Sequence, residues 1–238
     1  RRMTAPLRVG TRPSVLALTQ TRQFTSRLAA LHPGLAIEEV HIVSAGDLST
    51  DPLGRSSAPG LFVSELRASL LAGDTDLIVH SMKDLPARPH PGIVTACVPT
   101  RADPRDVLVS GTGRTLAELS PGSLVGTSSP RRAASIRRAR PDLVVAPIRG
   151  NVDTRLAKVQ RGDYDATMLA LAGLTRIGRS DAATEIFDEN IVVPAAGQGA
   201  LSVECRDDDA TRLLLAPLDD PLPRLVTTAE RAVLVGLD

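Results

Sequence analysis

Three reactive side-chain types follow one another between Ser81 and Asp84: a hydroxyl, the ammonium group of Lys83 and a carboxylate. They come directly after an apolar run, Asp76 to Val79, that is typical of a buried strand. Open α/β sheets bind their ligands outside the carboxyl ends of the strands, and a carboxylate fixed there can stabilise positive charge that develops in a reaction. The alternative is that Ser81 and Asp84 cap a turn, which is the commoner role of such residues in a loop. This segment alone does not decide between a ligand-binding site and a capped turn.

Arginine supplies the second group of candidates. Within Gly126 to Arg132 a serine precedes a proline at a predicted helix start, a pairing of N-cap and first-turn residue that leaves backbone N–H groups free beside two guanidinium groups. Guanidinium groups bind carboxylates through two parallel hydrogen bonds, so they predict a partner with several carboxylates or phosphates. Arg137, Arg138 and Arg140 are instead typical of a solvated helix face. The arginines predicted at strand ends or helix starts are Arg12, Arg131, Arg132, Arg149 and Arg155.

Alternating strands and helices must position these side chains. The first series is predicted to contain strands at 7–10, 35–43 and 76–79 and helices at about 18–31 and 62–72. The second contains strands at 107–110, 123–126, 143–148 and 166–170, with helices starting near residues 130, 152 and 172; a strand at 201–205 and a helix around 213–215 follow. The first order of elements is the signature of a parallel sheet, and both series are α/β. Crossing segments near Val98 and Pro194 join two halves that would form a hinged cleft, and the long loop Ser44 to Gly60 suits a lid or binding loop.

Composition narrows the function classes. The 238 residues are 42% hydrophobic and 23% charged, as in ordinary soluble proteins, and neither an apolar run of roughly 20 residues nor a secretory signal is present, so a cytoplasmic protein is expected. A net charge of +1 and few aromatic residues argue against a nucleic-acid face. Cys97 and Cys205 lie in predicted strands and are expected to be buried rather than joined in a disulfide. The four histidines show no zinc-type spacing, which argues against a metal site.

With these segments assembled, the sequence closely resembles the porphobilinogen deaminase family, also called hydroxymethylbilane synthase. The matching segments keep their order and spacing over nearly the whole chain. They are Gly10-Thr11-Arg12 with Ser14 and Leu16-Ala17-Leu18, Gly60-Leu61-Phe62-Val63 with Glu65-Leu66, His80-Ser81-Met82-Lys83-Asp84 with Pro86, Asp103-Pro104-Arg105-Asp106, Gly126-Thr127-Ser128-Ser129 with Arg131-Arg132, Arg149-Gly150-Asn151-Val152 with Thr154-Arg155-Leu156, Pro194-Ala195 with Gly197-Gln198-Gly199-Ala200, Glu204-Cys205-Arg206, and Ala229-Glu230-Arg231-Ala232.

The resemblance implies a cytoplasmic, monomeric transferase of tetrapyrrole (porphyrin, heme) biosynthesis. Such an enzyme condenses four porphobilinogen units head to tail with loss of ammonia, and water then releases hydroxymethylbilane. Two domains similar to periplasmic binding proteins are hinged about a cleft, and a small α/β third domain carries a dipyrromethane cofactor on a cysteine thioether. On this basis residues 1–98 with 198–216 form domain 1, residues 99–197 form domain 2, and residues 217–238 begin the third domain.

Residue roles are carried over by motif. Asp84 is the catalytic carboxylate, which would stabilise the cationic azafulvene left when ammonia departs from an aminomethylpyrrole. The cofactor-binding residues are Arg12, Ser81, Lys83, Ser129, Arg131, Arg132, Arg149 and Arg155. The substrate-binding or lid residues are Arg12, Phe62, Arg149, Arg155 and Gln198. Each added ring brings two carboxylates, which explains why arginines from many loops would converge.

Two departures from the family's pattern concern activity. Family members commonly have a lysine between the glycines before Leu-Phe, where this chain has Ala58-Pro59-Gly60, and Arg55 is the only base in that loop. The sequence stops at Leu237-Asp238, before the segment in which the family's cofactor cysteine comes, and Cys205 matches a different, strand-borne cysteine. The expectation is therefore that the 238-residue chain has no covalent anchor for dipyrromethane and makes no hydroxymethylbilane by itself.

Two other functions stay open on the residues alone. The first is a non-catalytic cleft protein that binds a small polycarboxylate, because two-domain architecture does not fix function. A plain receptor, however, would not need Asp84 among the arginines. The second is the effector domain of a transcription regulator, which the sequence disfavours because it shows no helix-turn-helix segment.

Overall fold

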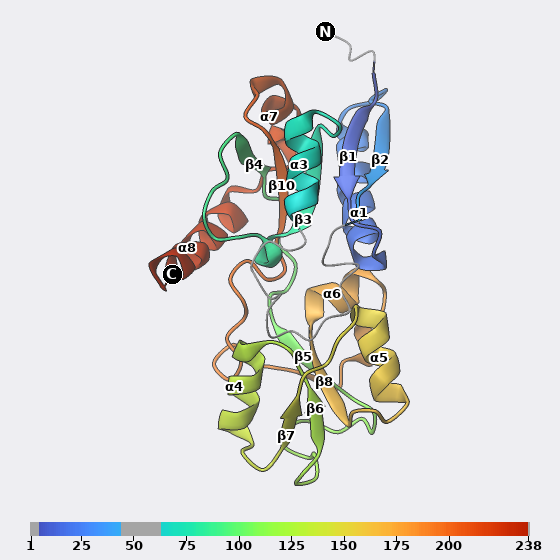
Figure 1. Ribbon diagram of the computed structural model, residues 1–238, viewed down its shortest axis with the longest axis vertical. Coiled ribbons are helices and arrows are strands. Elements are labelled where there is room, and N and C mark those ends of the chain that lie inside the picture. Colours follow the sequence, from blue (N-terminus) through green and yellow to red (C-terminus); the bar gives the residue numbers. More distant parts are fainter. Residues whose placement is uncertain (1–4, 44–62, 238) are drawn as a thin grey trace. The chain divides into compact units, whose positions relative to one another are not determined.

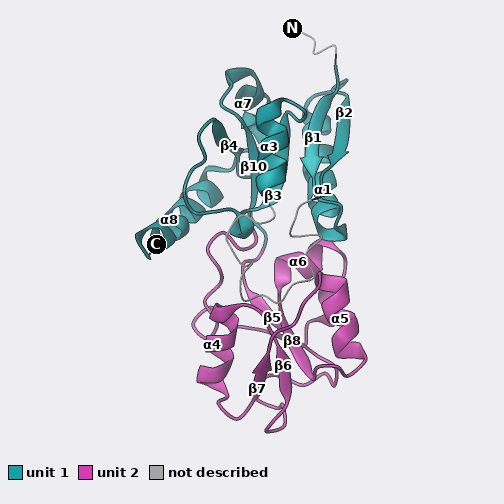
Figure 2. Ribbon diagram, in the orientation of Figure 1, with its two compact units in different colours: residues 1–102, 200–238 teal, residues 103–199 magenta. Residues whose placement is uncertain are grey.

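The computed structural model describes residues 5–43 and 63–237 (Figure 1). Contacts divide the chain into two compact units (Figure 2): residues 1–102 with 200–238 form unit 1, and residues 103–199 form unit 2. Each unit has its own sheet with helices packed on it, which confirms the predicted α/β class. The predicted loop from Ser44 to Gly60 lies outside the described residues.

The described strands of unit 1 form one mixed sheet. Its elements in chain order are β1 (Leu7–Thr11), α1 (Val15–Leu31), β2 (Ile37–His41), α3 (Ser64–Ala72), β3 (Leu77–Ser81), η1 (Met82–Asp84), β4 (Ile93–Cys97), β10 (Leu201–Arg206), α7 (Asp209–Leu215), η3 (Ala216–Leu218) and α8 (Pro221–Leu237). The strand order is β2-β1-β3-β10-β4, and β1 pairs in parallel with both β2 and β3. The carboxyl ends of β1 and β3 therefore lie at the same edge of the sheet.

Alternation along β3 decides which helix covers which face of this sheet. Leu77 packs into a cluster with Phe24 of α1, whereas the next residue, Ile78, packs with Leu70 of α3. Successive strand residues point to opposite faces, so α1 and α3 cover opposite sides. All four of these side chains are buried. Both faces of β3 are thus apolar, and its polar residues can reach a ligand only at the strand end.

The predicted parallel pairing holds for the three strands of the first series, β1, β2 and β3, and the later strand β10 adds an antiparallel partner. β10 runs antiparallel to both β3 and β4, and its Leu201 pairs with Ser81. The chain comes back from unit 2 at Ala200, beside the carboxyl end of β3, and can only run back along that strand. The first residue of β10 therefore lies next to the polar end of β3.

Unit 2 repeats the same design with a different chain order. Its elements are β5 (Asp106–Ser110), β6 (Leu124–Gly126), α4 (Pro130–Ala139), β7 (Val144–Ala146), α5 (Val152–Gln160), β8 (Ala166–Ala170), α6 (Leu171–Arg176), η2 (Ser180–Ala182) and β9 (Glu185–Ile186). The order of the described strands is β7-β6-β8-β5-β9. β6 is parallel to β7 and β8, while β5 is antiparallel to β8 and β9.

Two clusters on opposite faces of the second sheet hold its helices. Leu108 packs with Ile136 of α4 on one face. Its neighbour Val107 packs with Leu156 of α5 and Leu174 of α6 on the other. A short loop leads from β6 to α4, and another leads from β7 to α5. Because β6 and β7 are parallel, the first turns of both helices lie at the same edge of the sheet.

One prediction about the basic residues of this unit is wrong. Arg137 and Arg138 are exposed, as expected of a solvated helix face. Arg140, however, lies just beyond the last residue of α4, where it pairs with Asp142 and donates hydrogen bonds to three carbonyl oxygens of segment 116–119. Because it lies beyond the helix end, Arg140 links the segment 116–119 to the loop that contains Asp142.

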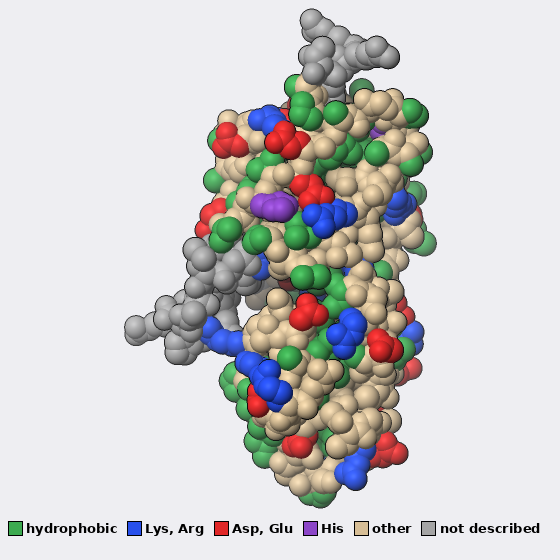
Figure 3. Space-filling view, turned by 90° about the vertical axis from the view of Figure 1, so that its right-hand side faces the viewer, with side chains coloured by type: hydrophobic (Ala, Val, Ile, Leu, Met, Phe, Trp, Pro, Cys, Tyr) green, Lys and Arg blue, Asp and Glu red, His purple; other side chains and the backbone are tan. Residues whose placement is uncertain are grey.

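The surface carries both signs of charge. On the face shown in Figure 3, basic and acidic side chains are interspersed without a continuous patch of either sign, in keeping with a net charge of +1. Among residues 5–43 and 63–237, no helix combines the length and the apolar character that a membrane span requires.

Helix α8 belongs to unit 1 by its contacts. Glu230 on this helix forms a two-pronged ion pair with Arg101, with N–O distances of 2.7 and 3.0 Å. The unit boundaries fall at 102/103 and 199/200, near the predicted crossings. The predicted domain boundaries, and the assignment of residues 217–238 to a third domain, stay predictions.

Candidate active site

Asp84 is the last residue of η1, a 3-10 turn that follows β3 without a break. Met82 is buried with Val98 and Ala200 and anchors the turn, while Lys83 and Asp84 are exposed. The Ser81 side chain does not cap the turn, and within the described part of the chain the Asp84 carboxylate makes no hydrogen bond or ion pair. The turn-capping alternative therefore lacks its hydrogen bonds, and the carboxylate is available to a ligand.

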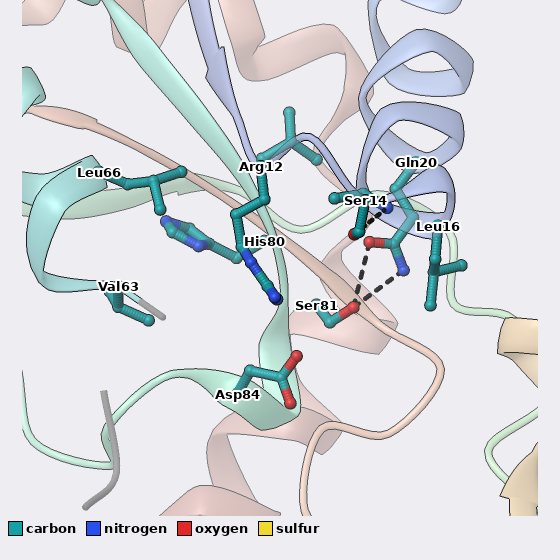
Figure 4. Close-up of a pocket in the computed structure, with 11 residues that line it drawn as sticks. Arg12, Ser14, Leu16, Gln20, Val63, Leu66, His80, Ser81 and Asp84 are labelled. Atoms are coloured by element: carbon teal, nitrogen blue, oxygen red, sulfur yellow. Dashed lines mark hydrogen bonds between the residues drawn. The ribbon is translucent and has the colours of Figure 1, made fainter. Parts of the chain in front are cut away.

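The Asp84 carboxylate lines a small pocket of about 60 Å³ at the edge where β1 and β3 end. Arg12 enters the pocket from the loop after β1, next to Ser14, whose hydroxyl accepts the N–H of Ala17 and so caps α1. Figure 4 shows Arg12 and Asp84 directed into the pocket toward one another. Residues 72 positions apart in the sequence thus supply a cation and a carboxylate to one site because their strands are parallel neighbours.

Ser81 is held in this pocket by Gln20, a residue of helix α1. The Gln20 amide donates to the Ser81 hydroxyl at 2.9 Å, and the hydroxyl donates back to the Gln20 carbonyl oxygen at 3.1 Å (Figure 4). Gln20 is itself buried on α1. The hydroxyl is therefore fixed in position, and it lines the pocket at the same strand end as Asp84.

A buried ionic group supports the strand that leads to Asp84. Glu204 of β10 accepts two hydrogen bonds from Arg67 of α3, at 2.6 and 2.9 Å. His80 Nε2 lies 3.3 Å from the Glu204 carboxylate, although the angle is not that of a hydrogen bond. Burial raises the pKa of Glu204, but Arg67 and the neighbouring His80 outweigh this and lower it from 4.5 to about 2. His80 and Glu204 both lie in segments that match the family, but nothing in the sequence indicated that their side chains are neighbours.

Arg231 of α8 contacts the turn itself. Its guanidinium donates to the carbonyl oxygens of Met82 and Leu85, each at 3.3 Å, and to that of Pro86. These carbonyl groups flank Asp84 on both sides, and desolvation lowers the pKa of Arg231. The segment Ala229-Glu230-Arg231-Ala232, one of those that match the family, therefore has a structural role beside the candidate catalytic residue.

The predicted anion site at the start of α4 is only partly free. Ser129 caps the helix by accepting the N–H of Arg132, and its own N–H is donated to Thr127 Oγ1. Of the first backbone donors of this helix, only the N–H of Arg131 has no partner among the described residues. The expectation of several free N–H groups is therefore wrong, because neighbouring hydroxyl groups satisfy them.

A buried carboxylate that sequence reasoning did not single out organises the arginines. Asp106, at the start of β5, accepts from Arg131 Nη1 at 2.6 Å and from Arg132 Nε and Nη2 at 3.0 and 2.6 Å. Gln198 Nε2 donates to the same carboxylate at 3.0 Å. Burial raises the pKa of Asp106, but the two arginines outweigh it and hold the pKa below its ordinary value. Arg132 and Gln198, both predicted to face ligands, are thus largely engaged inside the unit.

Three further arginines of unit 2 bear on the predicted anion site, two of them predicted and one not. Arg155, on the second turn of α5, donates only Nε, to Gly150 O at 2.8 Å; desolvation lowers its pKa, and Arg132 adds to that effect. Arg149 precedes the same helix and is partly exposed. Arg176, which sequence reasoning missed, donates to Gly199 O at 2.6 Å, and burial lowers its pKa to about 10.

Each half of the predicted site is thus assembled within one unit. Unit 1 contains Arg12, Ser81, Lys83 and Asp84, and unit 2 contains Ser129, Arg131, Arg132, Arg149, Arg155 and Gln198. Phe62 lies outside the described residues. Over the described ranges, no cluster of His, Cys, Asp or Glu could hold a metal ion, and both cysteines are buried free thiols.

Comparison with solved structures bears on the fold. A putative methionine-binding lipoprotein from Bacillus subtilis aligns over 92% of both chains with a TM-score of 0.55 at 10% identity. A YaeC-family lipoprotein from Enterococcus faecalis aligns over 90% of both chains with a TM-score of 0.51 at 12% identity. At such low identity the likeness shows the fold alone, and it confirms the predicted fold of two periplasmic-binding-protein-like domains.

Comparison with known sequences bears on the family. A family model described as porphobilinogen deaminase, dipyromethane cofactor binding domain, matches residues 7–213. The porphobilinogen deaminase of Acidothermus cellulolyticus is 52% identical, with 97% of this chain and 71% of the relative covered. That of Roseiflexus castenholzii is 50% identical, with 97% of this chain and 77% of the relative covered. The chain therefore belongs to the porphobilinogen deaminase family, as the motifs around Asp84 and the arginines predicted.

Proposed function

We propose that this protein is a hydroxymethylbilane synthase, a transferase that joins four porphobilinogen units head to tail with loss of ammonia and releases the linear tetrapyrrole by hydrolysis. Membership of the porphobilinogen deaminase family supports this reaction. The observation that carries the proposal is the Asp84 carboxylate, uncommitted among the described residues, opposite Arg12 in a pocket at the carboxyl ends of β1 and β3. No second function has an observation of this kind in its favour.

Asp84 is the proposed catalytic carboxylate. Loss of ammonia from the aminomethyl group of porphobilinogen leaves a cation delocalised over the pyrrole ring. A carboxylate held near the ring nitrogen stabilises this charge as it forms, and the fixed turn means that little reorganisation accompanies the step. Met82 and the contacts of Arg231 hold that turn. Since every condensation passes through the same kind of cation, one carboxylate serves all four rounds.

Arginines of both units are the proposed partners of the ring carboxylates. Porphobilinogen carries an acetate and a propionate group, and so does each ring of a dipyrromethane. The donor set fits such a group: Arg155 leaves both terminal nitrogens without a partner in the described structure, and Arg149 is partly exposed beside it. Arg12, Ser81, Lys83 and Ser129 complete the proposed cofactor contacts. A bound dipyrromethane supplies the primer from which the pyrrole chain grows.

The test replaces Asp84 by Asn, which keeps the shape of the side chain and removes its charge. Turnover of porphobilinogen by the longest natural form of the protein should fall by roughly 10²- to 10³-fold, the usual loss when an electrostatic stabiliser of a transition state is removed. Asp74→Asn is the matched control, because Asp74 is an exposed carboxylate of the same unit ahead of β3. Equal turnover of the two variants would refute the assignment. Binding of pyrrole carboxylates without any turnover by the unmodified protein would favour a receptor instead.

We also propose that the protein acts as a cytoplasmic monomer and binds neither nucleic acid nor membranes. Two buried free thiols support a reducing compartment, and a net charge of +1 supports small anions rather than nucleic acid as the partner. Sedimentation of the natural protein tests whether it is a monomer, and its distribution after cell fractionation tests whether it is cytoplasmic. A stable dimer, or recovery with the membrane fraction, would contradict them.

A further inference from the structure

The two adjacent arginines at the start of α4 differ in how much of their hydrogen-bonding capacity is free. Arg132 donates Nε and Nη2 to Asp106 and Nη1 to the Met168 carbonyl oxygen, and only 8% of its side chain is exposed. Arg131 uses Nη1 alone, and 27% of its side chain is exposed. All three nitrogens of Arg132 are therefore engaged within the unit.

The nitrogens that Arg131 keeps are suited to a carboxylate. Nη1 donates to Asp106 Oδ2 at 2.6 Å and to the Val193 carbonyl oxygen at 2.5 Å. Nε and Nη2, which form the side edge of the guanidinium fork, make no hydrogen bond among the described residues. A carboxylate binds such an edge through two parallel hydrogen bonds. The backbone N–H of Arg131 is likewise unused, and it lies at the positive end of the helix dipole.

Asp106 is the group that produces this difference. It is fully buried, and its two oxygens divide the arginines: Oδ1 accepts both bonds from Arg132, and Oδ2 accepts the single bond from Arg131. Gln198 Nε2 bridges Asp106 Oδ1 and the Pro104 carbonyl oxygen, at 3.0 and 2.6 Å. The carboxylate is thereby fixed to both ends of the chain segment that forms unit 2.

We propose that Asp106 is a positioning residue for ligand carboxylates: it withdraws Arg132 into the interior and holds Arg131 by one terminal nitrogen, so that the Nε–Nη2 edge of Arg131 is presented to an acetate or propionate group. The inference rests on the proposed function, because it takes pyrrole carboxylates as the ligands. It assigns the direct contact to Arg131 and an indirect role to Arg132.

A double-mutant cycle tests whether Asp106 acts through Arg131. The probe is the analogue of porphobilinogen with a methyl group in place of the aminomethyl group, which cannot react, and its affinity is measured by calorimetry. Asp106→Asn and Arg131→Ala should each weaken binding at least tenfold, and the double variant should be no weaker than Arg131→Ala. Asp142→Asn, which removes the carboxylate of the distant Arg140 pair, should change affinity less than twofold. Losses that multiply in the double variant would overturn the proposal.

A second measurement needs no variant and so covers the case in which Asp106→Asn does not fold. In the unmodified protein, the Nε–H signals of Arg131 and Arg132 are followed by NMR while the analogue is added. The Arg131 signal should shift and become protected from exchange with water, and the Arg132 signal should be protected beforehand and stay in place. A shift at Arg132 with none at Arg131 would refute the assignment. If the protein neither binds the analogue nor turns over porphobilinogen, the proposed function is refuted together with the role of Asp106. If the protein does bind the analogue or turn over porphobilinogen, but the losses of affinity in the double-mutant cycle are additive, only the role of Asp106 is refuted.

Discussion

Replacing Glu204 by Gln should destabilise unit 1 in a way that depends on pH. The substitution keeps the size of the side chain and removes the negative charge that holds Arg67, whose side chain is 10% exposed. His80, 3.3 Å from the same carboxylate, loses its acidic neighbour as well. The substitution therefore weakens the contacts that join α3, β3 and β10, close to the turn that carries Asp84.

The structure sets the size of the effect. A pKa lowered from 4.5 to about 2 corresponds to roughly 3 kcal/mol of stability, at about 1.36 kcal/mol per pKa unit. Removing one partner of a buried ion pair costs about 3–5 kcal/mol, because a charge is left unpaired. Because the pKa of Glu204 is depressed in the folded state, its contribution is fully present above about pH 4.5 and is lost as the pH falls toward 2. The variant should thus be less stable than the natural protein by roughly 3–5 kcal/mol at pH 7, and most of that difference should vanish near pH 2.

Urea denaturation from pH 7 to pH 2.5, read by hydrogen exchange at β3 and β10, measures unit 1 separately from unit 2. Glu39→Gln is the matched control, because Glu39 pairs with a mostly exposed Arg22 and exposed pairs contribute at most about 1 kcal/mol. A Glu204→Gln variant as stable as the natural protein at pH 7 would refute this reasoning. So would a stability difference that stays constant down to pH 2.5.

Two further outcomes follow from burial and packing. Neither thiol should react with iodoacetamide until the protein unfolds, because burial raises the pKa of Cys97 to about 12 and that of Cys205 to about 11; alkylation at native pH, mapped by mass spectrometry, would contradict this. Gly126→Ala should lower the free energy of unfolding by about 1–3 kcal/mol, since the new methyl carbon would lie 2.9 Å from the Ile148 side chain. Gly236→Ala in α8, where nothing lies within 4 Å, should be neutral or stabilising, and equal losses in both variants by thermal denaturation would rule out overpacking as the cause.

Much of the fold could be predicted because its signals are local. Ser129 and Pro130 marked the start of α4. The helix predicted at 62–72 ends as expected, since Gly73 follows it in the left-handed conformation with φ of +81°. Apolar runs located the predicted strands to within a few residues, whereas the two-residue strand β9 was not predicted. The direction of β10 is different in kind: it depends on where the chain re-enters unit 1, and no property of residues 201–206 encodes that.

The sequence predicted candidate site residues that line the pocket at the strand ends, and it missed the buried residues that pair with one another. Asp84 and Arg12 were predicted because each follows closely on the carboxyl end of a predicted strand, where open α/β sheets bind ligands. Glu204 lies inside a predicted strand and Asp106 directly before one, where an acid is normally exposed. Their burial becomes possible only because arginines from distant elements neutralise them. Such pairs join residues as far as 137 positions apart, so pattern and propensity along the chain cannot reveal them.

Helix geometry also contributes to the difference between Arg131 and Arg132, and this contribution could be derived from the sequence. With 3.6 residues per turn, neighbouring side chains leave an α-helix about 100° apart, so two consecutive arginines start from different faces of the helix. Once a helix was predicted from Pro130, one of the two had to turn toward the sheet while the other stayed near the surface. Ala133 and Ile136 are buried beside Arg132, which identifies the inward face. A buried guanidinium group needs a partner of opposite charge, and the structure identifies that partner as Asp106.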